Sequence, residues 1–248
     1  MTDIILCGAN GRMGKFITDA VSKRDDARIV AGVDLNTESA AGFPVFATIG
    51  EVNIPADVIV DFSHPALLDS ILAYVKEKNI PAVLATTGYS AEATAKIREA
   101  AKTSPLFFTF NMSLGVNLLV SLSKRAAEVL GDAFDVEIVE KHHNQKLDVP
   151  SGTAILLADA IKTVKTDAEY VIGRSDYGKR DKKEIGIHSL RMGSEVGTHE
   201  IIFAMGSQAI TLKHEAENRS LFADGAVSAA EFLVKQEKGF YNMDNILD

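Results

Sequence analysis

The segment Gly8-Ala9-Asn10-Gly11-Arg12-Met13-Gly14 decides the fold of the first part of this chain. It lies between a buried apolar run at 3–8 and a helical pattern at 13–23. Glycines permit a tight turn and let a diphosphate approach the amides at the start of the helix. The spacing G-x-x-G-x-x-G differs from the usual G-x-G-x-x-G, so a purely structural turn is the alternative to a dinucleotide site.

Strand and helix patterns alternate around this loop. Further buried strands are expected at 28–34, 57–63, 82–86 and 106–110, and helices at 65–78 and 91–102. Continuous apolar strands alternating with helices are typical of a parallel sheet that is covered on both faces.

The pattern changes after about residue 110. It predicts helices at 117–130 and 153–163 and strands at 135–141, 184–190, 199–204 and 208–214, the last two joined by a hairpin at Met205-Gly206-Ser207. A final helix at 221–235 is expected to return to the first domain. We therefore predict an α/β protein with a Rossmann-like parallel-sheet domain (1–110 and 216–248) and a C-terminal α+β domain with an open mixed sheet (111–215).

Composition excludes several classes of function. The 248 residues carry 26 Lys and Arg against 34 Asp and Glu, a net charge of −8 that disfavours nucleic acids and anionic membranes as partners. The single Cys7 rules out a disulfide framework and favours a reducing cytoplasm. Residues 103–123 lack charge but include ten Ser, Thr, Asn, Gly or Pro residues, which favours a strand, loop and helix over a membrane span.

Asp34 ends the predicted second strand, twenty residues after Gly14. An acid there can bind the ribose hydroxyls of a dinucleotide and would repel a 2′-phosphate. The next residue is Leu35 rather than an arginine, so NADH is favoured. Arg12 and Lys15 lie nearby in the sequence, which leaves the use of NADPH open.

Two more loops lie at the carboxyl ends of predicted strands, where such sheets bind ligands. They are Asp61-Phe62-Ser63-His64 and Ala85-Thr86-Thr87-Gly88. Contact with the ribose and carboxamide of a nicotinamide is one interpretation, and ordinary turn chemistry is the other.

A second cluster of reactive side chains occurs at 140–154. His142 and Lys146 offer acid–base groups, and Ser151-Gly152-Thr153 offers hydroxyls and amides at a helix start suited to a carboxylate. Adjacent residues on a strand point to opposite faces, so His142 and His143 do not suit one metal ion, and no metal site is predicted. Taken one residue at a time, a polar loop with a good helix cap explains the segment equally well.

The chain resembles the dihydrodipicolinate reductase family along its whole length. The most specific match is Glu140-x-His142-His143-x-x-Lys146-x-Asp148-x-Pro150-Ser151-Gly152-Thr153-Ala154. The glycine loop, Asp61-Phe62-Ser63, Thr86-Thr87-Gly88, Asn111-x-Ser113-x-Gly115-Val116-Asn117, Arg191-x-Gly193 and His214-x-Ala216 are similar too. Leu35 and Ala85 depart from residues common in the family, and both bear on the cofactor rather than on proton chemistry.

The resemblance implies an NADH- or NADPH-dependent oxidoreductase that reduces 4-hydroxy-tetrahydrodipicolinate or dihydrodipicolinate in lysine and diaminopimelate biosynthesis, as a homotetramer built through the second sheet. It implies His142 and Lys146 as catalytic residues. The expected substrate-binding residues are His143, Ser151, Gly152 and Thr153. The expected cofactor-binding residues are Gly8, Ala9, Asn10, Gly11, Arg12, Met13, Asp34, Ser63, Ala85, Thr86, Thr87, Thr109, Phe110, Asn111 and Met112.

Two other functions fit part of the sequence. An amino-acid or semialdehyde dehydrogenase could share the cofactor fold, but Cys7 belongs to the first strand and does not suit a nucleophile. A dinucleotide-sensing regulator would need a DNA-binding module, and no helix-turn-helix precedes the glycine loop. His188 and His199 are expected to serve the second sheet structurally.

Overall fold

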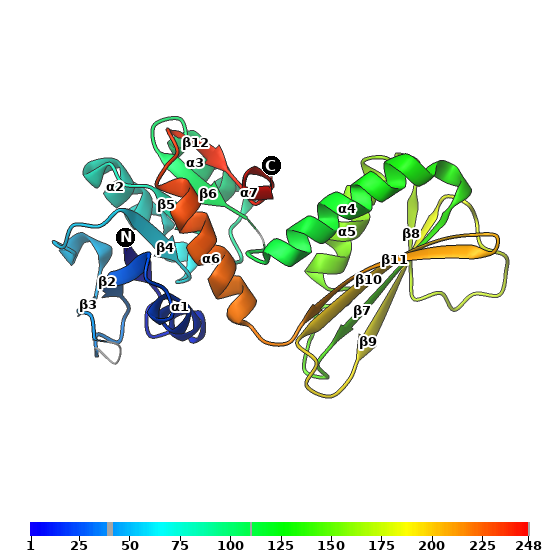
Figure 1. Ribbon diagram of the computed structural model, residues 1–248, viewed down its shortest axis with the longest axis horizontal. Helices are drawn as coiled ribbons and strands as arrows, with labels where there is room; N and C mark the ends of the chain where they lie inside the picture. The colour runs from blue at the N-terminus through cyan, green and yellow to red at the C-terminus, as the bar shows by residue number, and fades with distance from the viewer. Residues whose placement is uncertain (39–41, 110, 248) are drawn as a thin grey trace. The chain divides into compact units, whose positions relative to one another are not determined.

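The computed structural model describes residues 1–38, 42–109 and 111–247. It contains two compact units, the first made of Met1–Leu114 with Arg219–Asp248 and the second of Gly115–Asn218 (Figure 1). Among the described residues, no helix combines the length and apolar character needed to cross a membrane.

The first unit is built on a seven-stranded sheet whose neighbouring strands are all parallel. The order across the sheet is β12-β6-β5-β4-β1-β2-β3. The strands are β1 (Thr2–Cys7), β2 (Ala27–Val33), β3 (Val45–Phe46), β4 (Val58–Asp61), β5 (Ala82–Leu84), β6 (Pro105–Phe108) and β12 (Gly239–Tyr241).

Helices cover both faces of this sheet because its central strands are apolar on both sides. Ile4 and Leu6 of β1 join a core with α1 and α6, whereas Ile5 and Cys7 join a core with α2 and α3 on the opposite face. The helical elements are α1 (Arg12–Ser22), η1 (Ile49–Glu51), η2 (Pro65–Leu67), α2 (Leu68–Lys78), α3 (Ala91–Ala100), α6 (Ser220–Leu233) and α7 (Asp244–Leu247).

The second unit is a five-stranded mixed sheet with helices α4 and α5 on one face (Figure 1). The order is β11-β10-β7-β9-β8, with β10 antiparallel to both neighbours and β9 parallel to both of its own. The elements are α4 (Leu114–Leu130), η3 (Gly131–Ala133), β7 (Asp135–His142), α5 (Gly152–Lys162), β8 (Glu169–Ile172), β9 (Glu184–Arg191), β10 (Gly197–Met205) and β11 (Gln208–Ala216).

The predicted fold class is confirmed, and the differences lie in short elements. β3, β8, β12 and α7 were not predicted; each has only two to four residues and no long periodic pattern. The predicted helix at 65–78 begins as the 3₁₀ turn η2, where the His64 ring accepts a hydrogen bond from the Ala66 amide. The helix predicted at 221–235 is α6, and it packs on α1 in the first unit as expected.

Candidate active site

The glycine loop of the first unit brings the start of α1 against the ends of β1 and β4. A side chain at Gly14 would place its Cβ 2.3 Å from the carbonyl oxygens of Gly8 and Ala9. Gly8 has a φ of +80°, and a Cβ there would lie 2.6 Å from the Phe62 carbonyl oxygen. These glycines are therefore required by close backbone packing. The residue before the helix is Gly11, which has no side chain to cap the first amides of α1, so these can face an anionic ligand.

A pocket of about 440 Å³ opens at the carboxyl ends of the parallel strands in this unit. Most of the side chains predicted to bind a cofactor line it, although they come from four separate loops. The lining residues are Arg12, Met13, Phe62, Ser63, Ala85, Thr86, Thr87, Thr109, Asn111, Met112 and Phe222. Its position and its mixture of hydroxyl and apolar groups fit a dinucleotide.

Asp61 organises two of these loops from behind the pocket. Its carboxylate is fully buried at the end of β4 and accepts hydrogen bonds from the Ser63 hydroxyl, from Thr86 Oγ1 at 2.8 Å and from the Tyr89 hydroxyl at 3.1 Å. Burial raises the pKa of Asp61, and the three hydroxyl donors partly offset that effect. Asp61 thereby fixes the positions of Ser63 and Thr86 at the pocket wall.

Asp34 lies directly after β2 and is tied to the glycine loop. Its carboxylate accepts hydrogen bonds from the Asn10 amide at 3.0 Å and from the Asn36 amide at 3.1 Å. The Asn10 side chain in turn donates to the carbonyl oxygens of Asn36 and Glu38. These hydrogen bonds hold an acidic side chain beside the glycine loop, a position suited to recognition of a dinucleotide ribose.

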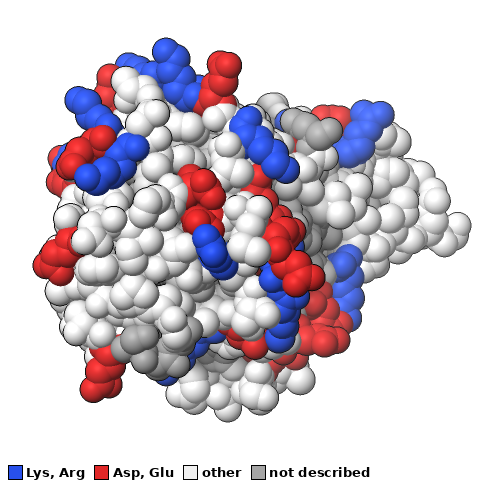
Figure 2. All heavy atoms as spheres, turned by 60° about the vertical axis from the view of Figure 1, so that its left-hand side comes forward, with Lys and Arg blue, Asp and Glu red and all other residues white. Residues whose placement is uncertain are grey.

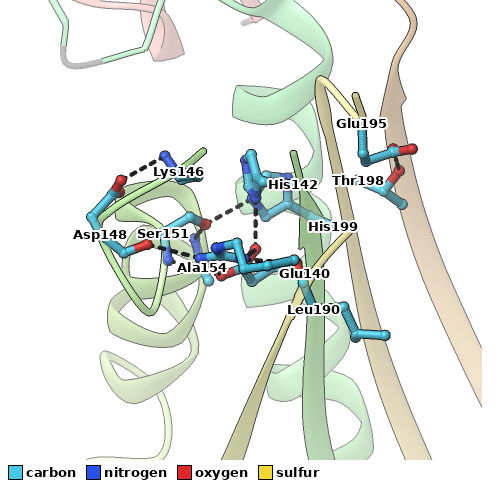
Figure 3. Close-up of polar contacts among 11 residues, drawn as sticks. Glu140, His142, Lys146, Asp148, Ser151, Ala154, Leu190, Glu195, Thr198 and His199 are labelled. Carbon is cyan, nitrogen blue, oxygen red and sulfur yellow. Dashed lines mark hydrogen bonds and ion pairs between the residues drawn. The ribbon is translucent and has the colours of Figure 1, made fainter. Parts of the chain in front are cut away.

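The predicted acid–base cluster lies in the second unit, on the face of the sheet that also forms the apolar core. Side chains alternate along β7, so Val136 and Ile138 pack in the core while Glu140 and His142 continue the same face. In the strand register, His199 of β10 lies opposite Glu140 and Arg191 of β9 lies opposite His142. Polar side chains near the ends of three neighbouring strands thus lie close together (Figure 3).

Glu140 is the centre of this cluster and is completely buried. Its carboxylate lies 2.6 Å from His142 Nδ1, accepts two hydrogen bonds from Arg191 at 2.7 and 2.8 Å, and accepts a third from the Ser151 amide at 3.1 Å. Burial acts to raise the pKa of Glu140, but the hydrogen bonds from His142 and Arg191 outweigh it and hold the pKa well below its usual range. The side chain of Glu140 is therefore ionised at neutral pH.

Ser151 caps helix α5 at the edge of the same cluster. Its hydroxyl accepts a hydrogen bond from the Ala154 amide at 3.2 Å and lies 3.0 Å from His199 Nε2 (Figure 3). The ring of His199 also packs edge-on against His142, with the ring centroids 5.1 Å apart. The start of α5 is thereby fixed beside His142.

The remaining predicted residues of 140–154 line the loop between β7 and α5. Lys146 Nζ pairs with Asp148 at 2.9 Å and keeps a side chain about one fifth exposed, and His143 is half-buried after the end of β7. Gly152 is exposed at the first position of α5, and Thr153 follows it half-buried. Asp148 also accepts a hydrogen bond from the Gly152 amide, so it ties Lys146 to the start of α5. A cation therefore lies beside the amino end of this helix.

Comparison with known protein families identifies the family of this chain. The family model described as "Dihydrodipicolinate reductase, N-terminus" matches residues 2–112, and the model for the C-terminus of the same family matches residues 115–247. The chain belongs to the dihydrodipicolinate reductase family.

Similar members of this reductase family include two curated 4-hydroxy-tetrahydrodipicolinate reductases. The protein of Clostridium novyi is 46% identical over 248 residues and that of Clostridium tetani is 48% identical over 249 residues, with 100% of this chain and 98% of each relative covered. The solved structure of a dipicolinate-bound dihydrodipicolinate reductase from Paenisporosarcina sp. TG-14 superposes with a TM-score of 0.83 at 27% identity, and 99% of each chain is covered. This chain is therefore a member of an oxidoreductase family that uses a pyridine nucleotide.

The structure places further residues beside those predicted from the sequence. Phe222 lines the pocket of the first unit together with Phe62 of the predicted 61–64 loop. Glu140, Arg191 and His199 lie around His142. His199, expected to serve the second sheet structurally, also contacts the Ser151 hydroxyl at the cap of α5. Phe110, predicted to bind the cofactor, lies outside the described residues. Within those residues, no group of three potential metal ligands comes together.

Proposed function

We propose that this chain catalyses the NAD(P)H-dependent reduction of 4-hydroxy-tetrahydrodipicolinate to tetrahydrodipicolinate in lysine and diaminopimelate biosynthesis. The observation that carries the proposal is the hydrogen bond between the buried Glu140 carboxylate and His142, beside the capped start of α5. An acid–base group next to an anion-binding helix end suits a substrate that carries a carboxylate and must exchange a proton.

The two carboxylates of the substrate would be held by the loop between β7 and α5. The amides at Gly152 and Thr153 and the Ser151 cap lie at the positive end of the helix macrodipole. Lys146 and His143 supply the nearby cation and polar ring. Fixed carboxylates would orient the ring for reaction, so that much of the rate gain comes from positioning.

The chemistry divides between the two units. Loss of the 4-hydroxyl group as water gives an unsaturated ring, and the reduction then adds one hydride and one proton to it. When bound at the pocket of the first unit, a reduced nicotinamide supplies the hydride. His142 and Lys146 supply the proton and stabilise the charge that develops on the ring. The first unit would thus be the dinucleotide-binding domain and the second the substrate-binding domain.

We propose NADH as the preferred cofactor. The carboxylate of Asp34, held by Asn10, would accept hydrogen bonds from ribose hydroxyls and repel a 2′-phosphate. Leu35, at 95% exposure, occupies the next position without offering a cation. Arg12, Lys15 and Arg219 line a separate pocket of the first unit, which is where NADPH would find cations if it binds.

We further propose a cytoplasmic homotetramer built through the second sheet. The face of that sheet opposite to the core carries apolar side chains, among them Leu190, exposed to 40%, and the half-buried Val139 and Ile202. The same face also carries ion pairs, among them Lys141 with Glu200 and Glu137 with His188. Acidic and basic side chains are also interspersed on the face drawn in Figure 2. Sedimentation analysis of the purified protein tests this state.

The proposed reaction can be tested without isolating its unstable substrate. Pyruvate, aspartate semialdehyde and the synthase that condenses them are mixed with NADH, and the absorbance of the reduced nicotinamide is followed after the chain is added. The control omits the synthase. Consumption of NADH that needs both proteins supports the proposal. No consumption with either NADH or NADPH refutes it, and consumption without the synthase would indicate a semialdehyde dehydrogenase.

A further inference from the structure

The position of the hydrogen on the His142 ring is set by its partner on the same strand, Glu140. Both oxygens of Glu140 are occupied: Oε1 accepts from Ser151 and Arg191, and Oε2 accepts from Arg191 and contacts His142 Nδ1. An ionised carboxylate accepts hydrogen bonds and cannot donate them. The atom 2.6 Å away, His142 Nδ1, must therefore carry the hydrogen.

Arg191 explains why the proton stays on the histidine. Its guanidinium group binds both oxygens of Glu140 in a fork and also donates to the Asp148 carbonyl oxygen at 2.8 Å. A buried carboxylate without a counter-charge would be costly and would compete for the proton of His142. The fixed cation makes Glu140 a weak base in spite of its burial.

The second nitrogen of the ring faces a position that lacks a side chain. A Cβ built on Gly197 would lie 3.0 Å from His142 Nε2, closer than such atoms normally approach. Gly197 is the first residue of β10, and His199 lies two residues further along the same strand. Glycine at 197 therefore keeps the space beside Nε2 open.

We propose that Glu140, held ionised by Arg191, is a positioning residue that keeps a proton on His142 Nδ1 and so assigns proton exchange with the substrate to Nε2, in the space beside Gly197. The transfer of the proton to a substrate rests on the proposed reductase function. The location of the hydrogen on Nδ1 does not depend on that function. In the reduction, the His142 imidazolium transfers its Nε2 proton to the ring that has accepted the hydride. His142 is left neutral with hydrogen on Nδ1, and Nε2 regains a proton from solvent.

The groups around His142 make the assignment specific. Glu140 lies on β7, His199 comes from β10, and Lys146 comes from the loop before α5 (Figure 3). Arg191 comes from β9 and pairs with Glu140. Burial, followed by the charge on His142, lowers the pKa of His199 to about 3, so His199 is neutral at physiological pH. Of the groups named here, Glu140 is the carboxylate that contacts the His142 ring directly.

The test compares Glu140→Gln with Glu137→Gln in the full-length protein. Glu137 is also on β7 and also pairs with a histidine and an arginine, His188 and Arg180, but on the opposite face of the sheet. We measure the histidine ring nitrogens by ¹⁵N NMR without substrate, and then kcat and KM against pH. Assignment of the His142 signals uses the His142→Asn protein.

The expected NMR result is hydrogen on Nδ1 of His142 in the wild-type and Glu137→Gln proteins, and a loss of that preference in Glu140→Gln. The expected kinetic result is a fall in kcat of at least about 100-fold for Glu140→Gln. Its KM should change little, its pH profile should shift, and Glu137→Gln should remain within about twofold of wild type. A neutral His142 ring with hydrogen on Nε2 and none on Nδ1 in the free wild-type protein, or an unaltered kcat in Glu140→Gln, would overturn the proposal.

Gly197→Ala provides a second variant that leaves the buried ion pair intact. Because the added methyl group would lie against Nε2, we expect kcat to fall at least about tenfold while hydrogen remains on Nδ1. An unchanged kcat would show that Nε2 is not the exchanging atom. If the wild-type protein consumes no reduced nicotinamide yet shows the Nδ1 tautomer, the reductase function fails and the positioning role of Glu140 stands.

Discussion

His199 Nε2 lies 3.0 Å from the Ser151 hydroxyl, a contact that joins β10 to the cap of α5. His199 is only 4% exposed, and burial lowers its pKa to about 3. The contact therefore holds the start of the proposed carboxylate-binding helix through a neutral ring, and it ties the stability of this part of the protein to pH.

The first prediction concerns acid stability. Because the pKa of His199 is lower in the folded protein than its ordinary value of 6.5, the unfolded chain binds a proton there that the folded chain does not. The contribution of a neutral His199 is fully present above about pH 6.5 and is lost as the pH falls toward about 3. In that window we expect His199→Asn to reduce the dependence of unfolding free energy on pH by up to about 1.4 kcal/mol per pH unit. Urea denaturation at a series of pH values measures the slope, and an unchanged slope would contradict the prediction.

The second prediction concerns the glycine loop. In Gly14→Ala, the new methyl group would clash with two carbonyl oxygens, so α1 must move away from the loop. We expect the unfolding free energy to fall by about 1–3 kcal/mol. We also expect the dissociation constant for NADH to rise at least about tenfold. Calorimetric titration measures the constant. Gly50→Ala is the matched control, because a Cβ at Gly50 meets open space; equal affinities in the two variants would argue against a phosphate site at the start of α1.

The third prediction concerns cofactor choice. Leu35→Arg places a guanidinium group next to Asp34, at a side chain that is 95% exposed. Stability should therefore change by less than about 0.5 kcal/mol. The ratio of kcat/KM for NADPH to that for NADH should rise about tenfold, because arginine binds phosphate strongly. Leu35→Gln controls for the loss of the apolar side chain. A ratio that rises as much in Leu35→Gln as in Leu35→Arg would show that charge at position 35 does not select the cofactor.

The sequence was sufficient to predict the layered plan of the first unit. Its strands are apolar on both faces and alternate with helices, a pattern that is almost confined to covered parallel sheets. Val45–Phe46 and Gly239–Tyr241 escaped prediction because two or three residues at the edge of a sheet have no periodicity of their own. Their pairing depends on neighbouring strands that are already in place.

The cluster around His142 was only partly predictable. The period of two along β7 places Glu140 on the same face as His142, so that relationship was available in the sequence. The approach of Arg191 and His199 depends on the register between β7, β9 and β10, which short-range patterns do not contain. The open position at Gly197 depends on the orientation of the His142 ring and could only be found in three dimensions.

The most direct test of the central claim is the rate of NADH consumption by Lys146→Ala in the coupled assay with pyruvate, aspartate semialdehyde and the synthase. Lys146 lies in the loop before α5 and pairs with Asp148, whereas Lys124 is exposed on α4 and provides the matched control. We predict a turnover at least about 100-fold below wild type for Lys146→Ala, an unchanged dissociation constant for NADH, and wild-type turnover for Lys124→Ala. Near-wild-type turnover in Lys146→Ala would contradict the assignment of reductase chemistry to this segment.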